Sequence, residues 1–79
     1  MYEIDTTELR KAMVEKGMFT SEALSVASGV NRNTVSEVVN GKTYPSTSVM
    51  ARIGSALGFS GSEMGRIFFK EKLASDASE

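Results

Sequence analysis

The sequence contains no cysteine and no histidine. Without cysteine the chain has no disulfide and no thiolate nucleophile, and without histidine it has no imidazole for acid–base catalysis. These two residue types are also the usual zinc ligands. We therefore expect a protein that is not an enzyme and that holds no metal and no cofactor.

Long apolar runs are also missing. No stretch approaches the roughly 18 apolar residues that span a bilayer. The first residues, MYEIDTTEL, do not place a basic region ahead of an apolar core, as a secretory signal would. The sequence therefore predicts no membrane contact and a cytoplasmic location.

Positive charge is scarce. Nine lysine and arginine residues stand against ten aspartate and glutamate residues, which gives a formal net charge of −1. Affinity for nucleic acid that rests on charge alone rises with the number of phosphates neutralised. This balance argues against binding that is driven only by charge.

What the sequence does contain is the composition of one small globular domain. It has 79 residues, of which 41% are hydrophobic and 24% are charged. We expect a single domain over residues 1–79, with an ordered core over about residues 5–74 and a frayed tail at 75–79. A core of this size is only marginally stable, so self-association is a reasonable expectation.

Apolar spacing and capping residues predict five helical segments, at about residues 5–16, 20–29, 31–40, 46–58 and 60–74. The expected N-caps are Asp5, Thr20, Asn31, Ser46 and Ser60, the last forming a capping box with Glu63. The residues expected to face inward are Leu9, Ala12, Met13, Leu24, Ala27, Val35, Val38, Val39, Val49, Met50, Ile53, Ala56 and Leu57. The pattern therefore predicts an all-α fold of five helices.

Residues 20–42, TSEALSVASGVNRNTVSEVVNGK, hold two of these segments around a tight turn. Gly29 allows the positive φ that a sharp turn between helices needs, and Val30 behind it can enter the core. The next segment begins with Asn31-Arg32-Asn33-Thr34. A helix that exposes amides, hydroxyls and a guanidinium at its start is suited to reading base edges in the major groove of DNA.

The spacing of these residues resembles the helix-turn-helix of the Cro and lambda-repressor-like proteins, the Xre family of phage and bacterial transcription regulators. The matching residues are Thr20, Glu22, Leu24, Ser28, Gly29, Val30, Arg32, Thr34, Val35, Ser36, Val38, Asn40, Gly41 and Lys42, continued by Pro45, Ser46, Ala56, Leu57 and Gly58. The likeness covers roughly residues 8–64. It implies a compact five-helix, lambda-repressor-like domain with its helix-turn-helix at the second and third helices.

Three positions depart from the family pattern. Ser21 stands where the family commonly has a glutamine that touches a phosphate, and Ser25 stands where alanine is usual. Within the third helix, Glu37 occupies a site that is often basic. The loop before the second helix also looks one residue longer than the commonest form.

The resemblance implies a set of DNA contacts. Arg32 would pair with guanine and Asn33 with adenine, while Asn31, Ser36 and Glu37 would lie beside the bases. The expected phosphate contacts are Thr20, Ser21, Thr34, Lys42, Thr43 and Tyr44. The alternative is that Asn31, Asn33 and Ser36 serve only as capping and solvated surface residues.

Residues 20–45 are locally neutral, with Arg32 and Lys42 against Glu22 and Glu37. We therefore expect a monomer to bind DNA weakly, and a second copy or a helper protein would supply the missing affinity. Candidates for that contact are Met64, Phe68 and Phe69, because large apolar residues lie on more than one side of the last helix. The alternative is that they all fill the small core.

The sequence therefore indicates a repressor-type transcription regulator that binds double-stranded operator DNA as a homodimer, with no small-molecule ligand. An alternative keeps the fold and changes the partner. In it, the chain is a phage-type anti-repressor or modulator that binds a companion repressor, or an antitoxin. A DNA reader should show a steep salt dependence, whereas protein masking should show a shallow one.

Overall fold

The computed structural model describes residues 1–72 of the chain. Within this range it has five helices and two short strands. They are β1 Tyr2–Glu3, α1 Thr6–Glu15, α2 Ser21–Ser28, α3 Arg32–Val39, α4 Thr47–Leu57, α5 Gly61–Phe68 and β2 Lys70–Glu71. The predicted all-α fold of five helices is confirmed, while the frayed tail predicted for residues 75–79 lies outside the described residues.

All five predicted N-caps are confirmed. In each, a side-chain oxygen accepts from a backbone N–H two or three residues further on. The pairs are Asp5 with Glu8 (3.2 Å), Thr20 with Ala23 (3.1 Å), Asn31 with Asn33 (2.8 Å), Ser46 with Val49 (3.3 Å) and Ser60 with Glu63 (3.2 Å). The carboxylate of Glu63 accepts in return from the Ser60 N–H at 2.8 Å, which completes the capping box. That hydrogen bond lowers the pKa of Glu63.

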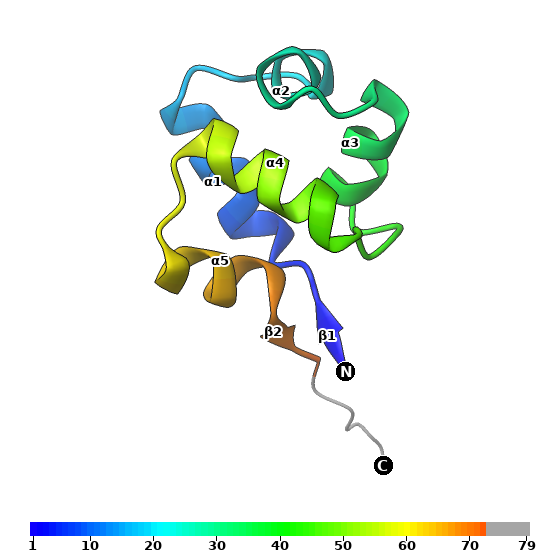
Figure 1. The fold of residues 1–79 in the computed structure, drawn as a ribbon, viewed down its shortest axis with the longest axis vertical. Helices are drawn as coiled ribbons and strands as arrows, with labels where there is room; N and C mark the ends of the chain where they lie inside the picture. The colour runs from blue at the N-terminus through cyan, green and yellow to red at the C-terminus, as the bar shows by residue number, and fades with distance from the viewer. Residues whose placement is uncertain (73–79) are drawn as a thin grey trace.

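The helices lie around one core (Figure 1). In this view α4 crosses the middle of the molecule with α1 behind it, α2 and α3 lie at one end, and α5 lies toward the other end with the two strands. The buried apolar residues are Ile4, Leu9, Met13, Leu24, Val30, Val35, Val38, Val39, Met50, Ile53, Leu57, Ile67 and Phe68. Ala12, Val49 and Ala56 pack against them, as predicted. Ala27 is exposed, so the prediction that it faces inward is wrong.

The turn between α2 and α3 has the predicted left-handed residue at Gly29, with φ 76°. Its N–H donates to the Ser25 carbonyl at 2.8 Å and so ends α2. The Ser25 hydroxyl then donates across the turn to the Val30 carbonyl at 2.5 Å. Ser28 Oγ accepts from the Val30 N–H at 3.2 Å. Ser25, which stands where the family usually has alanine, therefore helps to fix the angle between α2 and α3.

The predicted end of the last helix, at about Ala74, is wrong. Helix α5 ends at Phe68, because the chain beyond it pairs with the start of the protein. Strands β1 and β2 are antiparallel, with Tyr2 opposite Glu71 and Glu3 opposite Lys70. This pairing brings both ends of the described chain together (Figure 1).

Candidate nucleic-acid interface

Helix α3 has one buried side and one outward side. Val35, Val38 and Val39 are at most 7% exposed and fasten the helix to the core. The candidate base-contacting residues Asn31, Arg32, Asn33 and Glu37 are all exposed, and Ser36 is half-buried. The polar start of α3 is therefore presented to solvent by a stripe of valines that packs on the opposite side.

The side chains of three of the candidate base-contacting residues already have partners within the chain. Ser36 Oγ accepts from Asn40 Nδ2 at 3.4 Å. Asn31 Oδ1 accepts from the Asn33 N–H. The side-chain amide nitrogen of Asn31 is then the group that can donate a hydrogen bond to a base.

The Arg32 guanidinium lies near the second residue of α2, with 3.9 Å between Arg32 Nη1 and Glu22 Oε1. Both side chains of this ion pair are largely exposed, at 66% and 72%. Such a pair contributes about 0–1 kcal/mol and opens easily.

Four of the six candidate phosphate contacts lie at the two ends of the motif in the sequence. Thr20 and Ser21 stand at the start of α2, where helix geometry leaves N–H groups without intrahelical acceptors and the helix dipole is positive. Lys42 and Thr43 are exposed in the loop after α3. Thr34 is half-buried on α3 itself.

Tyr44, the last candidate phosphate contact, is 44% exposed, but its hydroxyl is hydrogen-bonded to another part of the chain. Its hydroxyl donates to the Phe68 carbonyl at 2.5 Å, and its ring meets Phe69 with centroids 6.4 Å apart. Desolvation, and to a lesser extent the neighbouring Tyr2, raise the pKa of Tyr44. A phenol has one proton to donate. A phosphate contact made by this hydroxyl as a donor therefore does not fit the structure.

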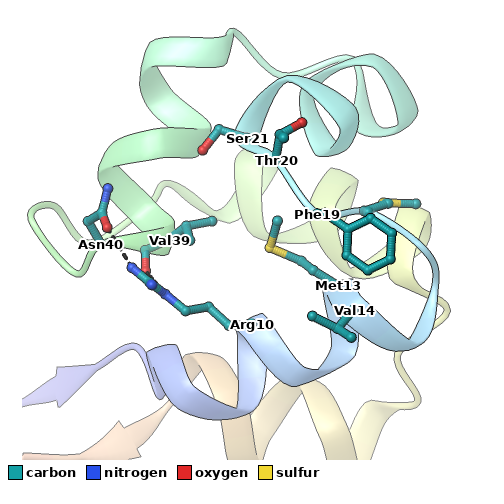
Figure 2. Close-up of a pocket in the computed structure, with 9 residues that line it drawn as sticks. Arg10, Met13, Val14, Phe19, Thr20, Ser21, Val39 and Asn40 are labelled. Carbon is teal, nitrogen blue, oxygen red and sulfur yellow. Dashed lines mark hydrogen bonds between the residues drawn. The ribbon is translucent and has the colours of Figure 1, made fainter.

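Sequence reasoning missed Arg10. This residue of α1 donates from Nη2 to Asn40 Oδ1 at 2.5 Å and from Nε to the Val39 carbonyl at 3.3 Å (Figure 2). Asn40 in turn donates from Nδ2 to the Ser36 carbonyl at 2.9 Å. Arg10 thus caps the C-terminal end of α3, where a cation also suits the helix dipole. Its partners are about 30 residues away in the sequence, so no local pattern reveals the contact.

A hollow of about 350 Å³ lies beside this cap. Figure 2 shows Arg10 and Asn40 on one side of it and Thr20 and Ser21 on another. The remaining lining residues are mostly apolar, namely Met13, Val14, Met18, Phe19 and Val39. The hollow therefore brings the N-terminal end of α2, the C-terminal end of α3 and a cation together at one place.

The three candidate partner contacts have different surroundings. Phe68 is fully buried at 0% exposure, so it fills the core and is not available to a partner. Met64 is half-buried and packs against the core. Phe69 is 43% exposed and meets Tyr2 edge to face, with centroids 5.6 Å apart. Of the three, Phe69 alone remains an exposed candidate.

Over the described residues, no helix is long and apolar enough to cross a membrane. Across residues 1–72, no group of three or more aspartate and glutamate side chains is arranged to hold a metal ion.

Comparison with known families gives a match. The sequence model of the Cro/C1-type HTH DNA-binding domain matches residues 8–63, which is more than half of the chain. The matched range contains α2, α3, α4 and most of α1, and it reaches the first turn of α5. No curated protein and no solved structure matches the chain. The likeness predicted over residues 8–64 is confirmed.

Proposed function

Because the chain belongs to the Cro/C1-type helix-turn-helix DNA-binding family, we propose that it is a repressor-type regulator that reads operator DNA with α3. The observation that carries this proposal is the exposed, N-capped start of α3, which lies opposite three buried valines. A helix held in this way can enter the major groove without disturbing the core.

Base recognition is assigned to the first turn and a half of α3. Arg32 would pair with guanine O6 and N7, and Asn33 with adenine N6 and N7. Glu37 lies one turn further along, where a carboxylate accepts from a cytosine amino group. Each good pair of this kind discriminates against the wrong base by about 1–3 kcal/mol.

Contacts with the DNA backbone are assigned to residues at the two ends of the motif. Thr20 and Ser21 stand at the start of α2, where the first N–H groups lack intrahelical acceptors, and they line the same hollow as Arg10 and Asn40. Lys42 and Thr43 are exposed and line a second hollow together with Asn40. Arg10 adds a third cation to a motif that otherwise contains Arg32 and Lys42, which lessens the shortage of positive charge.

Two copies acting together would supply the remaining affinity. Three cations neutralise few phosphates, so a monomer binds weakly at physiological salt. A homodimer would place two α3 helices in successive major grooves, about 34 Å apart. The operator should therefore contain two related half-sites one helical turn apart.

The test is a binding measurement on duplexes selected from a random pool and on the DNA that flanks the gene. Arg32→Ala should weaken binding to the selected duplex about 5- to 150-fold and relax the preference at one base pair. Arg66→Ala on α5 removes the same charge away from α3 and is the matched control, with an expected change of less than about two-fold. The proposal fails if Arg32→Ala and Asn33→Ala leave binding to every duplex unchanged.

A second candidate function is supported by the acids and the apolar side chains near the motif. Glu22 and Glu37 are exposed beside α3, and Phe19 and Val26 are 74% and 80% exposed at α2. Such a surface suits a modulator that binds a companion repressor and changes its DNA binding. Gel shifts with and without the product of the neighbouring gene separate the two functions. A shift that changes only with that product, with a shallow salt dependence, would support the modulator.

A further inference from the structure

The second hollow, which Asn40, Lys42 and Thr43 line beside the loop after α3, also reaches both ends of the described chain. Its volume is about 310 Å³, and Glu3 of β1 and Lys72 after β2 are among its lining residues. It adjoins the hollow of Figure 2, because Asn40 lines both. The proposed function assigns Lys42 and Thr43 to the DNA backbone, and Lys72 has no role in it.

Backbone pairing brings Lys72 to this hollow from the far end of the described sequence. Strands β1 and β2 run antiparallel, and the Lys72 N–H donates to the Met1 carbonyl at 2.9 Å. The side chains of Lys42 and Lys72 are exposed, and neither forms a salt bridge within residues 1–72. Two cations from distant parts of the sequence therefore line one hollow, and no acid of the described chain takes up either charge.

The loop after α3 is held against the same chain ends, so the hollow is a fixed feature of the fold. The Tyr44 hydroxyl donates to the Phe68 carbonyl, and the Tyr44 ring meets Phe69, with centroids 6.4 Å apart. Phe69 in turn meets Tyr2 of β1. The backbone positions of residues 42 and 72 are thereby set, and only the lysine side chains have to move to reach an anion.

The charges around this hollow favour a run of phosphates. Each lysine ammonium is a point charge with three donors, and Thr43 adds a hydroxyl. Two like charges in one hollow repel each other, and an anion beside each of them relieves that repulsion. A DNA strand carries a phosphate on every nucleotide, so one strand can supply an anion to each lysine. Glu3 opposes this, as the one acid among the described lining residues.

We propose that Lys72 binds a phosphate of the operator backbone next to the phosphate bound by Lys42, so that the paired chain ends form part of the DNA interface. This inference rests on the proposed function, which puts the loop after α3 against the DNA backbone. The contact carries no base information, so it strengthens binding to every duplex alike. It adds Lys72 to the three cations already assigned to the interface, and Glu3 weakens it.

The experiment measures the affinity of the full chain for a selected operator duplex and for a random-sequence duplex, at salt concentrations from about 50 to about 200 mM. Lys72→Gln removes the charge and keeps most of the side chain. It should weaken both complexes about five-fold at the lowest salt and less than about two-fold at the highest, because each phosphate contact contributes about 0.9 to the salt slope. Lys42→Gln should have the same effect, and the double variant should reduce the slope by about 1.8.

A structural role for Lys72 in the strand pairing has a different signature. It would lower the melting temperature, whereas Lys72→Gln should leave that temperature unchanged, because the backbone N–H that donates to Met1 remains. Lys72→Arg keeps the charge and should retain the salt slope of the unaltered chain. Lys70→Gln is the matched control. Lys70 is exposed on β2 but does not line the hollow, so both affinities should change less than about two-fold.

Glu3→Gln should act in the opposite direction. Removing this acid from the hollow should tighten both complexes about two-fold. Glu15→Gln, which removes an exposed acid at the end of α1, is its control and should leave both affinities unchanged. Equal tightening by the two variants would contradict a phosphate at this hollow.

The inference and the proposed function fail in distinguishable ways. If Lys72→Gln leaves the salt slopes unchanged while Lys42→Gln lowers them, or if Lys70→Gln lowers them as much as Lys72→Gln does, the chain ends hold no phosphate and the proposed function stands. If the unaltered chain binds no selected duplex better than random DNA, the proposed function fails and the inference fails with it.

Discussion

Helices α3 and α5 are both eight residues long, yet they are held in different ways. Helix α3 packs through one stripe of valines and is fastened at its two ends by Asn31 and by Arg10. Helix α5 buries Ile67 and Phe68 and presses Met64 against Gly54 of α4. The outward side of α3 contributes little to folding and is free to serve recognition, whereas the apolar side chains of α5 largely build the core.

The largest expected effect tests whether α5 is part of the core. Phe68 is fully buried beside Phe59, with ring centroids 6.1 Å apart. Phe68→Ala should lower the free energy of unfolding by about 4 kcal/mol, a large part of the total for so small a domain. Asn33→Ala on the outward side of α3 is the control, expected within about 0.5 kcal/mol. Equal midpoints in urea denaturation would show that the two helices do not differ in this way.

The second effect concerns the fastening of α3 at its C-terminal end. Arg10→Ala removes two hydrogen bonds, to Asn40 and to the Val39 carbonyl, and should cost about 1 kcal/mol. Hydrogen exchange should quicken for the backbone amides in the last turn of α3. The neighbouring Lys11→Ala breaks an exposed 3.4 Å ion pair within α1 and should cost about 0.3 kcal/mol. Unchanged exchange in α3 would mean that the valine stripe alone holds this helix.

The same contrast explains which features could be predicted from the sequence. The N-caps of α3 and α5 were predicted correctly because a capping side chain and its N–H partner lie two or three residues apart. The stripe of valines was predicted because its spacing is local too. The exposed candidates for base contact follow from that stripe.

Contacts between distant residues could not be predicted in this way. The end of α5 depends on pairing between residues 2–3 and 70–71 at opposite ends of the chain. The role of Arg10 depends on partners about 30 residues away, and in the sequence it is one more cation on a helix. The hydroxyl of Tyr44 is likewise committed to Phe68, 24 residues further on.

A third effect tests how tightly α5 packs on α4. A Cβ added at Gly54 would overlap Met64 Sδ and lie 3.2 Å from Met64 Cε. Overpacking costs about 1–3 kcal/mol, and alanine regains about 1 kcal/mol of helix propensity, so Gly54→Ala should destabilise by about 1 kcal/mol. In a Met64→Ala background the overlap is gone, and the same change should stabilise by about 1 kcal/mol. Thermal denaturation of the wild-type chain, the two single variants and the double variant measures this coupling, and independent effects would show that Met64 simply moves aside.

The smallest effect tests the link between the two regions, the hydrogen bond from Tyr44 after α3 to the Phe68 carbonyl at the end of α5. Tyr44→Phe should cost about 0.5 kcal/mol near neutral pH, because Tyr44 is 44% exposed and water can replace the lost partner. Because the folded state raises the pKa of Tyr44 above its usual 10.0, the unfolded chain loses this proton first as the pH rises. The stabilisation is therefore complete below about pH 10 and is lost as the pH rises through the folded pKa. The difference in unfolding free energy between the wild-type chain and Tyr44→Phe should shrink from pH 8 to pH 11, roughly one unit above the usual pKa of a tyrosine. A constant difference would mean that the phenol proton does not join the loop after α3 to the end of α5.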